Sequence, residues 1–180
     1  MTATPSAADP RTVRVIVDTD AKNECDDQFA IVHALLTPTF DIRGLVPAHF
    51  GTRRTHESLR ESREEIDLLL RLMKREGTVR VADGAPAARP AADVPADSPG
   101  ARLIVEEALR DDPRPLYVAF YGPLTEMASA VLMEPGIQDR DVTVVWIGGG
   151  EYPEGGPEFN LSNDIEAANV VFRSRLKVWQ

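Results

Sequence analysis

The sequence has a single cysteine, no long apolar run and fewer basic than acidic residues. Because Cys25 is alone, no internal disulfide can form, which favours a reducing compartment. No stretch approaches the roughly 20 apolar residues that a membrane-spanning helix needs, and residues 1–11 lack the apolar core of a signal peptide. We therefore expect a cytoplasmic protein with no membrane partner, in which residues 1–11 form a disordered leader.

The excess of acidic residues narrows the range of partners. Asp and Glu together number 29 against 20 for Lys and Arg, which gives a net charge of −9. Such a chain is repelled by nucleic acid and by anionic membrane surfaces, so neither is expected as a partner. A neutral small molecule or a bound cation suits the charge better. The length fits one domain, which we expect to span residues 12–180.

Apolar segments of strand and helix type alternate along the chain. The strand candidates are short and rich in β-branched residues: Val13–Val17, Ile42–Val46, Val79–Val81, Leu116–Phe120, Val142–Ile147 and the chain end, Leu176–Gln180. The helix candidates are Asp26–Leu36, Thr55–Arg75, Arg102–Arg110, Leu124–Met133 and Asp164–Arg173, and residues 82–100 are expected to form a long loop. This alternation predicts an α/β fold, an open and mostly parallel sheet flanked by helices. In such sheets ligands bind beyond the carboxyl ends of the strands.

A dense acidic cluster follows the first predicted strand. Asp18, Asp20, Glu24, Asp26 and Asp27 lie within ten residues, with one lysine among them. Like charges this close are costly unless they are solvated, protonated or neutralised by a cation, and calcium accepts several carboxylates in a flexible geometry. The simpler interpretation stays open: acidic residues are favoured in the first turn of a helix, and Asp18 can end a strand as a turn residue. The spacing of an EF-hand loop is absent.

The segment that carries this cluster, VIVDTDAKNECDDQFAI, resembles the amino-terminal signature of the inosine-uridine preferring nucleoside hydrolase family, DTD-x-x-x-DD before an apolar helix. The resemblance implies that Asp20 and Asp27 bind Ca²⁺, that Asp26 contacts ribose, and that Asp20 is also the catalytic base, with Asp18 in support. The spacer differs, because five residues, Ala21 to Cys25, separate DTD from DD here and the Pro-Gly usual after DTD is missing. The chain therefore looks like a divergent branch.

Further segments match in the same order. Tyr121-Gly122-Pro123-Leu124-Thr125 resembles the family's TGPLT turn, which implies that the Tyr121 backbone carbonyl binds calcium. By itself it reads equally as an ordinary turn before a helix. Gly148-Gly149-Gly150 follows a strand as a family Gly-Gly motif does, and glycines allow backbone to approach a ligand closely.

The last matching segment supplies sugar-binding groups. Glu158-Phe159-Asn160, followed by Asp164-Ile165-Glu166-Ala167-Ala168, resembles the family's EFN…DPEAA stretch. The resemblance implies that Glu158 and Asn160 bind ribose hydroxyls, whereas Asp164 is expected to cap a helix. After the second strand the family's Gly-Asn is replaced by Pro47-Ala48-His49-Phe50-Gly51, so His49 is a candidate for lining the pocket.

The resemblance spans about residues 13–180 and implies a Rossmann-like nucleoside hydrolase fold. The implied reaction is hydrolysis of the N-glycosidic bond of a ribonucleoside by a calcium-activated water. The family's carboxyl half supplies a further calcium-binding aspartate and a histidine near the leaving base, and neither has a candidate here. We therefore expect a truncated amino-terminal portion, or half of a site that another polypeptide completes. By analogy with the family, a homo-oligomer is also expected.

Two other functions remain open. One is a catalytically silent calcium- or ribose-binding module that lacks the carboxyl-terminal half of the site. The other is a phosphatase with Asp18 as nucleophile and Asp20 as acid. The D-x-D-G-T pattern of that phosphatase family is not met, because Ala21 and Lys22 follow Asp20, and so this function ranks last.

Overall fold

The fold is a five-stranded sheet with helices packed on it, seen in a computed structural model that describes residues 11–180. The predicted leader, residues 1–11, lies outside the described residues apart from Arg11. The strands are β1 (Val13–Thr19), β2 (Phe40–Pro47), β3 (Leu116–Phe120), β4 (Val142–Trp146) and β5 (Lys177–Trp179). Their order in the sheet is β2-β1-β3-β4-β5, and all four pairings are parallel. The predicted α/β class is thus confirmed.

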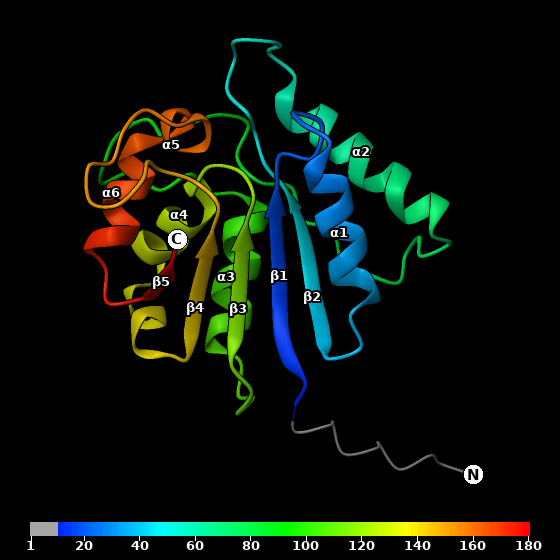
Figure 1. Ribbon diagram of the computed structural model, residues 1–180. Helices are drawn as coiled ribbons and strands as arrows, with labels where there is room; N and C mark the ends of the chain where they lie inside the picture. The colour runs from blue at the N-terminus through cyan, green and yellow to red at the C-terminus, as the bar shows by residue number, and fades with distance from the viewer. Residues whose placement is uncertain (1–10) are drawn as a thin grey trace.

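The helices form two groups on opposite faces of the sheet (Figure 1). On one face lie α3 (Pro99–Leu109), α4 (Thr125–Met133) and α6 (Ile165–Arg173), whose apolar residues share a buried cluster with Ile16, Val118 and Val144. On the other face lie α1 (Asp26–Leu36) and α2 (Ser58–Leu72), which pack against Val15, Val17 and Leu45. A short α5 (Phe159–Asn163) and a 3-10 helix, η1 (Pro135–Asp139), complete the described elements. None of the described helices is long and apolar enough to cross a membrane.

Most predicted elements are confirmed, with changes at their ends. The predicted strand Val79–Val81 is wrong: Val81 makes an isolated parallel bridge to Leu45, and the chain then turns away. Helix α2 begins at Ser58 rather than Thr55, because the Thr55 hydroxyl accepts from the Glu57 N–H and closes a turn before the helix. Helix α5 lies where the sequence analysis places no helix. It forms because the Glu158 carboxylate accepts from two N–H groups of its first turn, a local capping effect that apolar periodicity cannot reveal.

The two helix groups leave part of the sheet uncovered. Helices α1 and α2 lie over β1 and β2, and no helix of the described chain covers the same face of β3, β4 and β5 (Figure 1). A cavity of about 520 Å³ opens there, lined largely by apolar and aromatic side chains that include Tyr117, Tyr121, Val145 and Trp179. Parallel sheets are normally covered on both faces. This surface is therefore an unusual feature of the described structure.

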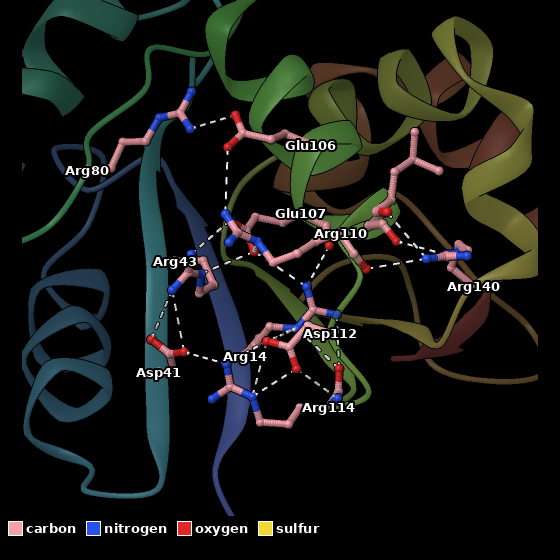
Figure 2. Close-up of polar contacts among 12 residues, drawn as sticks. Arg14, Asp41, Arg43, Arg80, Glu106, Glu107, Arg110, Asp112, Arg114 and Arg140 are labelled. Carbon is pink, nitrogen blue, oxygen red and sulfur yellow. Dashed lines mark hydrogen bonds and ion pairs between the residues drawn. The ribbon is translucent and has the colours of Figure 1, made fainter. Parts of the chain in front are cut away.

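An ion-pair network closes the amino ends of the strands (Figure 2). Arg14 is 3% exposed, and its guanidinium donates to the backbone carbonyls of Glu107 (2.6 Å) and Arg114 (2.9 Å). The Glu107 carboxylate accepts from Arg43 (3.1 Å) and Arg110 (2.8 Å). This network fastens β1, β2 and α3 to one another at the edge opposite the predicted site.

Candidate functional site

The predicted site lies where the central strand β1 meets α1. Asp18 and Thr19 end β1, and Asp26 and Asp27 open α1. Although the run is acidic, three of its carboxylates are buried: Asp18 is 0%, Asp20 1% and Asp27 5% exposed. Burial of unpaired charge is costly, so a role as ordinary solvated surface does not explain these three side chains.

A cavity of about 120 Å³ gathers most of the predicted site residues. Six of them line it: Asp20, Asp26, Asp27, Tyr121, Glu158 and Asn160. They come from the β1–α1 loop, the end of β3 and the start of α5, which are far apart in sequence but meet at the carboxyl edge of the sheet. The other lining residues are Asn23, Glu24, Ile147 and Phe159. The sequence prediction did not include these four as site residues.

The electrostatics of the cavity disfavour ionised carboxylates. Burial, reinforced by repulsion from Asp27, raises the pKa of Asp20 to about 8. Burial likewise raises the pKa of Asp27 to about 6, although a hydrogen bond donated by the Thr19 hydroxyl opposes the shift. One oxygen of Asp20, Oδ2, is buried and has no hydrogen-bond partner in the described residues. The cavity thus presents buried carboxyl groups that pair with no Lys or Arg of the described residues.

Asp18 lies behind this cavity rather than in its wall. Both of its carboxylate oxygens are buried without a partner in the described chain. Burial, together with repulsion from Glu126, raises the pKa of Asp18 well above its usual range. Its backbone carbonyl accepts from the Tyr121 N–H at 2.9 Å and so joins β1 to the turn after β3. No side-chain contact of Asp18 defines a role, so its supporting role stays a prediction.

Glu158 and Asn160 hold the far wall together. Glu158 accepts from the N–H groups of Gly149 (2.8 Å), Asn160 (2.9 Å) and Leu161 (3.0 Å). Gly149 has φ +77°, a conformation that favours glycine and that the triple-glycine turn supplies. The Asn160 amide donates to the carbonyls of Tyr121 and Ile147, both at 2.9 Å. The Tyr121 carbonyl, a predicted calcium ligand, therefore already accepts one hydrogen bond, and its second lone pair is left for another ligand.

His49 does not line this cavity, contrary to the sequence prediction. It is fully buried, its Nε2 lies 3.0 Å from the Thr125 hydroxyl, and its Nδ1 accepts from the Gly51 N–H at 3.3 Å. Thr125 donates in turn to Asp164 at 3.0 Å, which places the His49 proton on Nε2. Burial lowers the pKa of His49 to about 4, against the opposing effect of Asp164. His49 is therefore a neutral member of a buried hydrogen-bond network behind the site, because the chain after β2 turns inward.

The donor set can be tested against a divalent cation. Two buried carboxylates, Asp20 and Asp27, and one carbonyl, Tyr121, border the same cavity, and oxygen donors of this kind suit calcium. Within residues 11–180, however, no group of three or more His, Cys, Asp or Glu side chains is arranged to hold a metal ion. The described residues therefore fit part of a calcium coordination shell, with two carboxylates and one carbonyl.

Solved structures define the class to which this fold belongs. A plant nucleoside hydrolase, PpNRh1, superposes with a TM-score of 0.72 at 24% identity, over 92% of this chain and 58% of that chain. A purine-preferring ribonucleoside hydrolase from Gardnerella vaginalis gives the same TM-score at 23% identity, over 92% of this chain and 59% of its own. At these identities the likeness concerns the fold, which is the Rossmann-like fold of nucleoside hydrolases.

Sequence comparison identifies the family itself. The family described as inosine-uridine preferring nucleoside hydrolase matches residues 15–180, so the chain belongs to that family. A pyrimidine-specific ribonucleoside hydrolase RihA from Salmonella newport is 28% identical over 85% of this chain and 55% of its own length. A probable uridine nucleosidase 2 from Arabidopsis thaliana is 30% identical over 88% of this chain and 55% of its own. The chain thus spans little more than half the length of these relatives.

Proposed function

We propose that this chain carries the sugar-binding and metal-binding part of a ribonucleoside hydrolase, which cleaves an N-glycosidic bond to give ribose and free base. One observation carries the proposal: six residues chosen from the sequence line one small cavity at the carboxyl edge of the sheet. Family membership over residues 15–180 supports the reaction class. Asp26, Glu158 and Asn160 are the proposed ribose ligands, because a sugar diol needs both acceptors and donors.

Calcium is the proposed cofactor, held by the Asp20 and Asp27 carboxylates and the Tyr121 carbonyl. When bound, a divalent cation supplies positive charge that lowers the pKa of a nearby water and helps to orient the sugar hydroxyls. Asp20 is the proposed base and removes the proton from the attacking water. The carboxylates that line the cavity stabilise the positive charge that develops on the sugar ring, as in other glycoside cleavages.

Relatives carry names that point to different bases, pyrimidine-specific in one case and purine-preferring in another. The proposed partner is a small-molecule nucleoside and not a nucleic acid, and the proposed location is the cytoplasm.

The test is an assay of the purified chain for reducing sugar released from a panel of purine and pyrimidine nucleosides, with calcium or with a chelator. We expect calcium-dependent release. Asp20→Asn or Asp27→Asn should lower kcat by about 10²-fold or more, because each removes a charged group that acts on the reacting centre. Asp111→Asn, at an exposed position after α3, is the matched control and should retain activity. Turnover that persists in the chelator would contradict the proposal.

A silent binding module is the second candidate. The incomplete set of metal-binding side chains within residues 11–180 favours it. It predicts calcium or ribose binding by titration calorimetry, abolished in Asp27→Asn, with no sugar released from any nucleoside.

A further inference from the structure

The β1–α1 loop is fastened to its surroundings by side chains outside the cavity. This loop, Ala21 to Cys25, is the spacer that is longer than the family pattern. The Lys22 ammonium donates to Glu65 on α2 at 2.8 Å, and the Gln28 amide donates to the Ala21 carbonyl at 3.0 Å. Asn23, at the centre of the loop, lines the cavity. The position of the loop therefore sets the position of one wall.

Arg54 joins this wall to the wall that α5 forms. It lies in the connection between β2 and α2, and its Nη1 donates to both the carbonyl and the side-chain oxygen of Asn23, each at 2.7 Å. The same guanidinium carbon lies 6.0 Å from the centroid of the Phe159 ring, at the start of α5. Phe159 also lines the cavity. One exposed side chain thus contacts two cavity residues that are far apart in sequence.

The chemistry of these contacts requires arginine. A planar guanidinium can donate several hydrogen bonds at its edge while its face or carbon lies near an aromatic ring, whereas an ammonium group is a compact, strongly hydrated charge. Arg54 is exposed, so it adds little to the stability of the core. Its effect is local, on the relative positions of Asn23 and Phe159.

We propose that Arg54 is a positioning residue that holds the two walls of the cavity in the arrangement that accepts the substrate. The inference rests on the proposed function for its effect on turnover. The contacts of Arg54 with Asn23 and Phe159, called the clamp below, are a property of the chain itself. Without Arg54 the walls would be positioned independently, and only a fraction of molecules would be ready to bind. The apparent affinity is then the intrinsic affinity multiplied by that fraction. Because Arg54 contacts no reacting atom, the loss should appear in KM rather than in kcat.

The kinetic test uses Arg54→Ala and Arg54→Lys, with Arg53→Ala as the matched control. Arg53 is the adjacent arginine and is likewise exposed. With calcium and the best nucleoside of the panel, Arg54→Ala should raise KM roughly five- to tenfold and leave kcat within about twofold. Arg54→Lys should keep the charge but restore little of the affinity. Arg53→Ala should match the wild type, and an unchanged KM in Arg54→Ala would overturn the inference.

A second measurement needs no turnover. Lys22 is adjacent to Asn23, and the chain has only three lysines, the others being Lys74 and Lys177. A lysine-specific protease therefore reports on the loop without its sites being altered by the arginine variants. We expect cleavage after Lys22 to become several-fold faster in Arg54→Ala, with cleavage after Lys74 and Lys177 unchanged, and no change in Arg53→Ala.

The two measurements separate the clamp from the reaction. Faster cleavage after Lys22 in Arg54→Ala, in a chain that turns over no nucleoside, supports the clamp and contradicts the proposed hydrolase function. Equal cleavage rates after Lys22 in wild type and Arg54→Ala overturn the clamp, whatever the activity of the chain.

Discussion

Acidic residues near the amino end of strand β1 pair with arginines, whereas those near its carboxyl end do not. At the amino end, the Arg114 side chain donates to Asp112 and lowers the pKa of that carboxyl. Although burial alone would raise the pKa of Glu107, hydrogen bonds from Arg43 and Arg110 bring it below its usual value. Figure 2 shows these arginines converging on the carboxylates between them. Each of these acids is ionised and neutralised within the chain.

At the carboxyl end the acids lack such partners. Burial raises the pKa of Asp18, Asp20 and Asp27, and the nearby lysine, Lys22, is directed to Glu65 on α2 instead. Acidic side chains thus stabilise the fold at the amino end of β1, and their ionised forms destabilise it at the carboxyl end. A carboxylate cluster therefore indicates function when the protein buries it and leaves it without a cationic partner.

The free energy of unfolding should fall most when the ion-pair network at the amino end of β1 loses Glu107. Glu107→Ala removes a carboxylate that is 2% exposed, pairs with the buried Arg14 and accepts from Arg43 and Arg110, and it leaves Arg14 with only the longer ion pair to Asp112 at 3.8 Å. The free energy of unfolding should fall by about 3–5 kcal/mol, measured by urea denaturation. The matched control is Glu106→Ala, where an exposed carboxylate pairs with Arg80 at the surface. There the loss should stay within about 1 kcal/mol, and equal losses in the two variants would contradict the contrast.

A smaller effect is expected from adding calcium, and it depends on pH. Asp20 and Asp27 have pKa values of about 8 and 6 in the folded chain, above those of an unfolded aspartate. The stability that their protonated forms contribute is therefore fully present below the unfolded pKa of about 3.9, and it is lost as the pH rises from there through 6 for Asp27 and 8 for Asp20. Without metal, this contribution makes the chain less stable at pH 8.5 than at pH 5.5.

Calcium should reverse that loss, because the ionised carboxylates are the ones that bind a cation. At pH 8.5, calcium at 100 times its Kd should raise the free energy of unfolding by about 2.7 kcal/mol. The gain should be much smaller at pH 5.5, where protons compete. Thermal unfolding with calcium or chelator measures both, and Asp27→Asn should lose most of the gain. An equal gain at the two pH values would show that calcium binds elsewhere.

The smallest effect is expected at Asp18, behind the cavity. Asp18→Asn removes a buried acid whose oxygens have no partner in the described residues. Stability at pH 8.5 should rise by about 1 kcal/mol, a modest gain because the new amide also lacks partners. Urea denaturation measures it, with Glu107→Gln as the contrasting variant, which should be destabilised. A loss of stability in Asp18→Asn would show that its charge is neutralised in the fold after all.

The α/β class and most elements were predicted from apolar periodicity, and the six cavity residues were predicted from the resemblance of the motifs at the strand ends to those of the family. The sequence did not predict the helix at Phe159–Asn163, which forms through a cap on Glu158 rather than through an apolar face. It also gave no signal for Arg54, whose partners are 31 residues before it, at Asn23, and far beyond it, at Phe159. Contacts of this kind depend on how loops meet, which a local pattern does not encode.

His49 is a residue that the sequence analysis placed in the cavity and that the structure places outside it. A histidine just after a strand is well placed for a pocket, but its direction depends on Thr125 and Asp164, which lie far along the chain. The sequence located the edge of the sheet correctly, and for His49 it could not tell whether the side chain turns into the cavity or into the core.

Tyr121 borders two spaces at once, the small acidic cavity and the wide apolar hollow on the uncovered part of the sheet. Because one residue contributes to the lining of both, a change in its side chain acts on two spaces of opposite polarity. A mutational effect at this position therefore reports on the sheet surface as much as on the acidic pocket, and a Tyr121 variant has to be interpreted with both in view.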